Sequence, residues 1–228
     1  MQNTISLALI TTAMGLALGG CAHESGARES NGIDPKPTLP EPAQLEGAQF
    51  HGDDEAATVA RNGVAGVVRV IDAFVAAKQA NDLDALQADA GLVYADGAQI
   101  FQSQEFMTPD RLGPAGFVHM VDFLYTELGQ GQEALHPLQI CQVYAYYPDD
   151  SDPDTVEWIM TSQTQVPSFG ALIATAKMAA ERQADGWRLT YHDYFDAPAP
   201  GEDCNGAQVR KVHDAWLCQV SPDAAGCE

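Results

Sequence analysis

The sequence predicts an α+β domain whose helices come first along the chain and whose antiparallel sheet follows. Apolar side chains recur at helical spacing in residues 57–81 and again in residues 117–128. From residue 138 onwards the apolar period changes to two, which is the period of a strand buried on one face. Helices followed by a run of strands favour an α+β fold, because the apolar face of the sheet needs helices to cover it.

The first part of this domain is expected to be helical. The first helix begins near Ala57 and ends at Asn81, where polar residues interrupt the apolar pattern. Asp82 can then cap a short helix over residues 83–88, because its carboxylate can accept a hydrogen bond from an amide of the first turn. Pro114 suits the first position of the next helix, because its φ is already fixed near the helical value.

Strands dominate the second part. We expect them over residues 138–147, 156–163, 172–182 and 187–195. Asp185-Gly186 lies between the last two and is typical of a two-residue hairpin turn. Asp96-Gly97 predicts a similar turn earlier in the chain, between short strands at 92–94 and 100–101.

The N-terminus has the pattern of a secretory signal that ends in a lipidation site. Residues 5–18 are largely apolar, but the run is shorter than the roughly 20 residues that span a bilayer. The sequence Leu-Gly-Gly-Cys then ends at Cys21 and has the form of a lipobox. We expect residues 1–20 to be removed and a lipid on Cys21 to hold the protein to a membrane. The alternative is an ordinary signal peptide followed by a chance cysteine.

The residues around the signal suggest where the domain is held. In lipoproteins of Gram-negative bacteria an Asp after the lipidated cysteine favours the inner membrane, so Ala22 predicts the outer membrane, facing the periplasm. Residues 21–56 are rich in Pro, Gly, Ser and Glu and predict a disordered tether. The folded domain is expected over residues 57–197, and residues 198–228 form a Cys-containing tail with a short helix.

Composition excludes several classes of function. The chain has 32 Asp and Glu against 11 Lys and Arg, a net charge of −21, and such a field repels nucleic acids. No phosphate-binding loop, GxSxG or HExxH motif occurs, so no cofactor is predicted. Asp150, Asp152 and Asp154 imitate the start of a calcium loop. Thr155 and Thr161 stand where that loop needs Gly and Glu, so a hairpin turn is expected there and no metal site.

Four cysteines remain after Cys21 and predict two disulfides in an oxidising compartment: Cys141, Cys204, Cys218 and Cys227. No pair has the CxxC spacing of a zinc site. A helix between Cys204 and Cys218 would hold them roughly 18 Å or more apart, beyond disulfide reach. Of the two pairings that remain, we prefer Cys141 with Cys204 and Cys218 with Cys227; the alternative joins Cys141 to Cys218 and Cys204 to Cys227.

Two segments resemble a known superfamily. The stretch IDAFVAAKQANDLDAL (71–86) resembles the opening helix pair of nuclear transport factor 2-like, or SnoaL-like, domains, and DGWRLTYHDYFD (185–196) resembles their closing hairpin. The resemblance covers about residues 57–197. It implies a cone-shaped, cystatin-like roll, in which a curved antiparallel sheet wraps around N-terminal helices and leaves a pocket at its mouth. Members include isomerases, dehydratases and cyclases, and also non-catalytic binding domains, so the fold alone does not choose a function.

The resemblance also points to candidate site residues. Phe74 stands where the isomerases of the family carry a tyrosine, which argues against steroid isomerase chemistry. Tyr191 and Asp193 stand where the family has two histidines. By strand alternation both share a face with Trp187 and Leu189, directed into the cone. Asp193 would then be a desolvated acid or base with Tyr191 as its partner. The alternative is a solvent-exposed Asp193 near the strand end.

Aromatic side chains are expected to line the pocket or simply to form the core: Phe74, Tyr144, Trp158 and Trp187. His192 alternates to the other face, at the surface or in a homodimer interface through the sheet. Two functions are carried forward. The first is a lipoprotein that binds a small apolar or amphipathic ligand or has an accessory role in the envelope. The second is a small-molecule enzyme of the cyclase, isomerase or dehydratase type that uses Asp193.

Overall fold

The structure is a computed structural model of the chain. It describes residues 40–102, 112–123, 125–126, 136–149, 151–166, 170–194, 199–223 and 225–227. The signal, Cys21, the tether up to residue 39 and Asp150 lie outside these ranges, so the expectations placed on them stay predictions. No helix within the described ranges is both long and apolar enough to cross a membrane.

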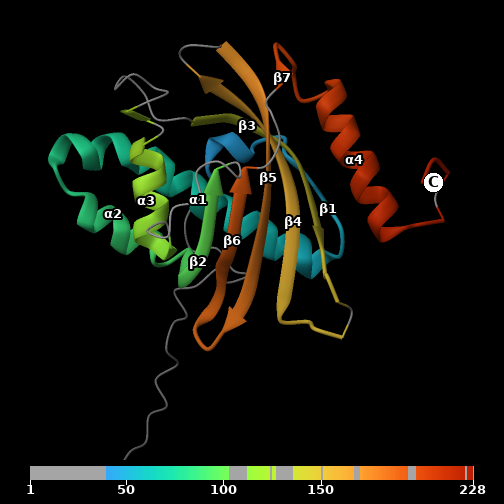
Figure 1. Cartoon of the computed structure of the whole chain (residues 1–228), viewed down its shortest axis with the longest axis horizontal. Helices are drawn as coiled ribbons and strands as arrows, with labels where there is room; N and C mark the ends of the chain where they lie inside the picture. Colours follow the sequence, from blue (N-terminus) through green and yellow to red (C-terminus); the bar gives the residue numbers. More distant parts are fainter. Residues whose placement is uncertain are drawn as a thin grey trace, which may run out of the picture.

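Most of the described residues belong to one sheet and the helices packed on it (Figure 1). In chain order the elements are η1 (Ala43–Leu45), β1 (Gln49–His51), α1 (Asp54–Ala80), α2 (Leu83–Ala90), β2 (Tyr94–Gln102), α3 (Gly113–Phe123), β3 (His136–Tyr146), β4 (Thr155–Val166), β5 (Gly170–Gln183), β6 (Gly186–Tyr194), β7 (Ala199–Pro200) and α4 (Ala207–Val220).

The sheet runs in the order β1-β3-β4-β5-β6-β2. Its centre is an antiparallel meander from β3 to β6, while β1 and β2 add parallel edges and β7 pairs with one end of β5. The predicted α+β class is confirmed, because helices precede this meander and cover the sheet. One detail differs: β2 is a single strand from Tyr94 to Gln102, with an irregularity between Tyr94 and Gln99. The hairpin expected at Asp96-Gly97 is therefore wrong.

The long helix α1 covers one face of the sheet, called here the inner face. Asp53 caps the start of the helix, because its carboxylate accepts a hydrogen bond from the amide of Glu55, and Asn81 caps its end in a left-handed conformation. One core joins the helix to the sheet; among its members are Val64, Val67, Val68, Ile71 and Phe74 of α1 with Trp158, Met160, Met178, Trp187 and Leu189 of the strands. This apolar contact is the main source of stability, because burial of a large side chain contributes about 1.5–3 kcal/mol.

The opposite face, called here the outer face, is partly covered by α4. Val212 and Trp216 of α4 pack against Tyr144 and Tyr146 of β3. The disulfide Cys141–Cys204 joins β3 to the turn before α4, and Cys218–Cys227 joins the end of α4 to the last residues. The pairing preferred from the sequence is confirmed. In Figure 1 α4 lies on the right, away from α2 and α3 on the left.

Folded structure begins earlier than the sequence suggested. Leu45 of η1 is only 2% exposed and belongs to the inner core. β1 then pairs in parallel with β3, through Gln49 and Gln142 and through His51 and Tyr144. Placing the tether boundary at residue 56 was therefore wrong, because one buried leucine and an edge strand fix residues 43–51 to the domain.

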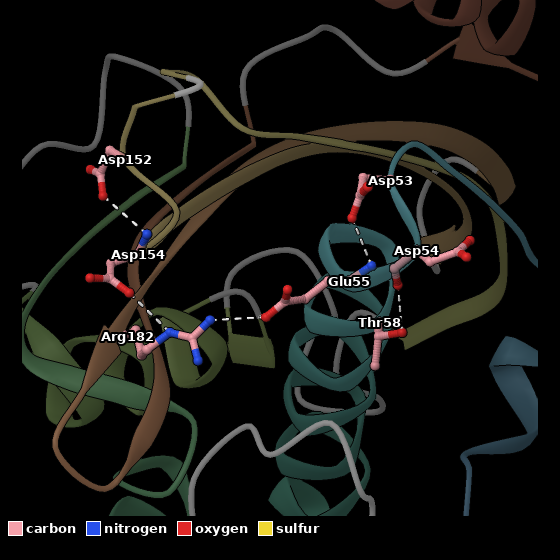
Figure 2. A network of polar contacts seen from close by, with 7 residues as sticks. All are labelled: Asp53, Asp54, Glu55, Thr58, Asp152, Asp154 and Arg182. Carbon is pink, nitrogen blue, oxygen red and sulfur yellow. Dashed lines mark hydrogen bonds and ion pairs between the residues drawn. The ribbon is translucent and has the colours of Figure 1, made fainter.

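Charged side chains tie the β3–β4 turn to the start of α1. Arg182 at the end of β5 contacts Glu55 through Nη2 at 2.9 Å and Asp154 through Nε at 3.0 Å (Figure 2). Asp152 accepts hydrogen bonds from the Asp154 amide and the Thr155 hydroxyl, which makes residues 151–155 a hairpin turn as expected. These groups are 45–64% exposed, so the contacts orient the turn but contribute little stability.

The two disulfides should differ in what they contribute. Chain-entropy arguments give about 4 kcal/mol for a loop of 63 residues and about 2.5 kcal/mol for one of 9 residues. We expect Cys141→Ser/Cys204→Ser to lower the free energy of unfolding in urea more than Cys218→Ser/Cys227→Ser does. Alkylation and mass analysis of the exported protein provides the control, and four reactive thiols there would contradict both bonds.

Candidate functional site

The orientation of side chains along β6 is set by an irregularity at Thr190. Ala180 of β5 pairs with Leu189, whereas the next residue, Ala179, pairs with Tyr191. One residue of β6 is therefore extra, as in a β-bulge, and a bulge reverses the side to which later side chains point. The simple alternation assumed for this strand holds up to Leu189 and fails after it.

The bulge exchanges the predicted faces of three residues. His192 pairs with Met178, a core residue of the inner face, and is itself 0% exposed. Tyr191 and Asp193 point to the outer face, where Asp193 lies opposite Lys177. The expectation that Tyr191 and Asp193 share the inner face with Trp187 is wrong. The expectation of a surface or interface position for His192 is wrong for the same reason.

His192 forms a buried polar pair with Tyr94. The Tyr94 hydroxyl lies 2.7 Å from His192 Nδ1, and Tyr94 is 1% exposed. Phe117 of α3 packs against both rings, with centroids 4.6 Å from Tyr94 and 5.8 Å from His192. Three elements, β2, α3 and β6, therefore hold one hydrogen-bonded pair inside an otherwise apolar interior.

Burial fixes the protonation state of this pair. It lowers the pKa of His192 to about 3, because a charged imidazole would lose its hydration in the interior. At neutral pH the ring is therefore uncharged, with one nitrogen that donates and one that accepts. Such a ring can hold a neutral polar group in place, but it is a poor general base at that pH.

Trp158 adds a third polar group to the inner face. It pairs across the sheet with Met178, which pairs in turn with His192, so the three side chains stand in one row over β4, β5 and β6. Trp158 and His192 are roughly 10 Å apart, because neighbouring strands are about 4.8 Å apart. Trp158 is 0% exposed, and no atom of the described residues accepts a hydrogen bond from its indole nitrogen.

The four predicted pocket aromatics do not share a face. Phe74, Trp158 and Trp187 belong to the inner core, and Phe74 lies 5.4 Å from Tyr125 between ring centroids. Tyr144 points the other way, because its neighbour Ala145 is the residue that pairs with Trp158. The expectation that Tyr144 lines an inner pocket is wrong: its ring packs under Trp216 of α4.

Tyr191 and Asp193 do contact each other on the outer face. The Tyr191 hydroxyl donates to Asp193 Oδ2 at 3.1 Å, and burial together with this carboxylate raises the pKa of Tyr191. Nearby, Glu157 Oε2 accepts from the Tyr146 hydroxyl and pairs with Lys177, each at 2.7 Å. These pairs lie on the outer face of the sheet, where Asp193 Oδ1 is buried without a hydrogen-bond partner among the described residues. Within the described ranges no group of three or more His, Cys, Asp or Glu is arranged to hold a metal ion.

The buried His192 should make the fold sensitive to acid. Below pH 6.5 the unfolded chain takes up a proton on this imidazole, whereas the folded chain does not until about pH 3. As the pH is lowered through that interval, this imidazole should therefore reduce the free energy of unfolding by about 1.4 kcal/mol per pH unit. We expect His192→Gln to flatten the pH dependence of urea unfolding between pH 4 and pH 6.5 relative to the native protein. An unchanged slope would show that His192 does not titrate in this way.

Comparison with known proteins finds distant structural likenesses. The chain matches no protein-family model and no curated protein. An NTF2-like protein with a cystatin-like fold from Novosphingobium aromaticivorans is 17% identical over 71% of this chain and 98% of its own, with a TM-score of 0.38. An NTF2-like protein from Pseudomonas putida is 11% identical over 59% and 92%, with a TM-score of 0.37. A hexachlorocyclohexane dehydrochlorinase from Novosphingobium barchaimii is 13% identical over 66% and 97%, with a TM-score of 0.37.

These likenesses are too distant to carry an argument about activity. The fold rests on the strands and helices described above. It agrees with the resemblance in residues 71–86 and 185–196. The chain is thus similar in fold to NTF2-like proteins.

Proposed function

We propose that this chain is an exported lipoprotein whose folded domain binds a small apolar or amphipathic ligand at the inner face of its sheet. The observation that carries the proposal is the Tyr94–His192 hydrogen bond, buried in an otherwise apolar interior. Ligand sites in proteins combine an apolar lining with a few fixed polar groups. A buried neutral pair of this kind selects one orientation of a ligand without demanding a charge on it.

Trp158 supports the same location. A buried N–H group without an acceptor costs about 1–3 kcal/mol, and a ligand with a carbonyl, ether or hydroxyl oxygen would remove that cost. Met178 stands between Trp158 and His192 in the same row. Its unbranched thioether can adopt several shapes, so the side chain can move aside for a ligand and fill the space without one. The proposed ligand is therefore largely apolar and carries at least one hydrogen-bond acceptor.

Binding is favoured over catalysis by the same geometry. The enzyme hypothesis needed Asp193 and Tyr191 in the interior, and both lie on the outer face. His192 cannot replace them as a general base, because its pKa of about 3 is far from neutral. The inner face therefore offers hydrogen bonds and apolar contact, which serve recognition.

The membrane partner and the location are proposed from the sequence. Lipid on Cys21 would hold the domain at the outer membrane, facing the periplasm, and Ala22 supports that membrane. A homodimer through the sheet could use less of the outer face than the sequence suggested, because Tyr144 and Tyr146 on that face are already packed against α4. A second copy would have to use the part of that face formed by β5 and β6.

Replacement of the lipidated residue tests the location. We expect Cys21→Ser to abolish partitioning with membranes, because acyl chains contribute about 0.8 kcal/mol for each buried CH₂ and no other anchor is proposed. Fractionation of cells before and after a salt wash measures the effect. A variant that remains with the membrane after the wash would remove the lipid from the proposal.

Removal of the Tyr94 hydroxyl tests the binding site. Small molecules that copurify with the native protein are identified by native mass spectrometry and then added back in a melting experiment. We expect Tyr94→Phe to weaken binding about fivefold to tenfold, the effect of one lost hydrogen bond, because His192 then loses the partner that orients it.

Asp193→Asn is the matched control, since this variant also changes a residue beside His192 but on the outer face. The added ligand should raise its melting temperature as much as that of the native protein. Full binding by Tyr94→Phe together with weak binding by Asp193→Asn would move the site to the outer face.

A further inference from the structure

Two histidines meet on the outer side of the molecule, where the edge strand β1 lies beside α4 (Figure 1). His51 is the last residue of β1 and His213 lies in the middle of α4, and their ring centroids are 5.7 Å apart. The rings of Tyr144 and Trp216 flank the pair, with centroids 5.0–6.1 Å from those of both histidines. Both histidines are partly exposed, so a small ion in solution can reach them.

The orientation of the His51 ring is fixed from two sides. The ring stacks on Tyr144 with 12° between the two planes, and its Nε2 lies 2.6 Å from Gln142 Oε1. The side-chain nitrogen of Gln142 donates to Gln49 Oε1 at 3.2 Å, so the Gln142 oxygen, which only accepts, faces His51. His51 Nε2 therefore donates this hydrogen bond, and Nδ1 keeps its lone pair.

This hydrogen bond has the form found around metal-binding histidines. A metal-bound imidazole almost always donates its other N–H to a carbonyl or carboxylate oxygen, which fixes the tautomer and makes the coordinating nitrogen more basic. Gln142 Oε1 supplies such an oxygen to His51. Gln142 would thus be a positioning residue, and His51 Nδ1 would be the ligand atom.

The separation of the two rings suits one metal ion. Imidazole nitrogens bind Zn²⁺ at about 2.0–2.1 Å, so two rings on one tetrahedral ion have centroids about 5 Å apart. The separation of 5.7 Å between His51 and His213 differs from this value by an amount that side-chain rotation can supply. Two imidazoles are fewer protein ligands than most zinc sites have, so water would complete the coordination.

The charge around the pair favours a cation. Burial and, second, the negative charge of Asp214 raise the pKa of Tyr144, which places that carboxylate close to the aromatic cluster. Arg210 of the same helix is turned toward the start of α4, where its Nη1 donates to the Asn205 carbonyl. The whole chain carries a net charge of −21, which attracts cations at longer range.

We propose that His51 and His213 bind one divalent transition-metal ion of the zinc type, and that this ion fastens α4 to the edge of the sheet. Imidazole nitrogen suits Zn²⁺, Cu²⁺ and Ni²⁺, whereas Ca²⁺ and Mg²⁺ prefer oxygen ligands. The ion would add a second connection between α4 and the sheet beside the Cys141–Cys204 bond. This site does not depend on the ligand proposed for the inner face.

The test compares Zn²⁺ with Ca²⁺. The mature chain carrying Cys21→Ser is freed of metal with EDTA, dialysed, and titrated calorimetrically with each ion. We expect one Zn²⁺ per chain to bind at least about tenfold more tightly than Ca²⁺, because surface carboxylates bind both ions but imidazoles select the former. Zn²⁺ should also raise the melting temperature, because it binds the folded chain.

Variants then locate the site. His51→Gln and His213→Gln should each lower the affinity for Zn²⁺ at least about tenfold, because each removes one of the two protein ligands. His119→Gln is the matched control, since His119 is exposed on α3, which lies away from α4 in Figure 1. This control should change the affinity less than about twofold. Melting of the metal-free variants shows that they fold.

The role of Gln142 gives a readout that aromatic packing alone would not produce. Gln142→Leu should lower the affinity for Zn²⁺ about tenfold, whereas Gln142→Glu should keep it, because a carboxylate accepts the same hydrogen bond from His51. Equal affinity for Zn²⁺ and Ca²⁺, no detectable binding of Zn²⁺, or equal losses in the His119 control and the two site variants would each overturn the proposal. Equal losses in the two Gln142 variants would overturn the positioning role.

Discussion

The close approach of α1 to the inner face of the sheet is the constraint on which the rest of the structure depends. A Cβ at Gly63 would lie 2.9 Å from the ring of Trp158, and one at Gly66 would lie 2.8 Å from Val93. Glycine inside a helix costs about 1 kcal/mol relative to alanine. At these two positions glycine leaves the space in which the side chains of Trp158 and Val93 reach the helix backbone. The close packing of Trp158 against α1 sets the position of its indole nitrogen on the inner face. Met178 and His192 follow in the same row across the sheet.

Element types followed from periodicity, but the candidate site did not, and β6 shows why. Alternation correctly places Trp187 and Leu189 on the inner face, and the extra residue Thr190 then moves His192 inside and Asp193 outside. No local residue pattern marks this bulge, since Thr190 has ordinary strand propensity. β3 gave a related error, because both of its faces are apolar: Val143 and Ala145 face α1 while Tyr144 faces α4. Which face is inner depends on a helix far along the chain.

The N-terminal boundary failed for a different physical reason. Prolines and polar residues up to position 56 predict a flexible chain by composition, and composition is insensitive to a few specific contacts. Leu45 is buried in the core, Arg69 donates to the Pro40 carbonyl at 2.9 Å, and Arg61 stacks over Phe50 at 4.2 Å. Arg61 and Arg69 belong to α1, so the helix supplies contacts that hold the segment before it.

The interior position of the proposed site restricts the ligands that it can recognise. In the interior, desolvation keeps His192 neutral, and any recognition must use dipoles and shape, which favours uncharged ligands. α4, fastened to the outer face through Cys141–Cys204, covers the aromatic residues Tyr144 and Tyr146 on that face.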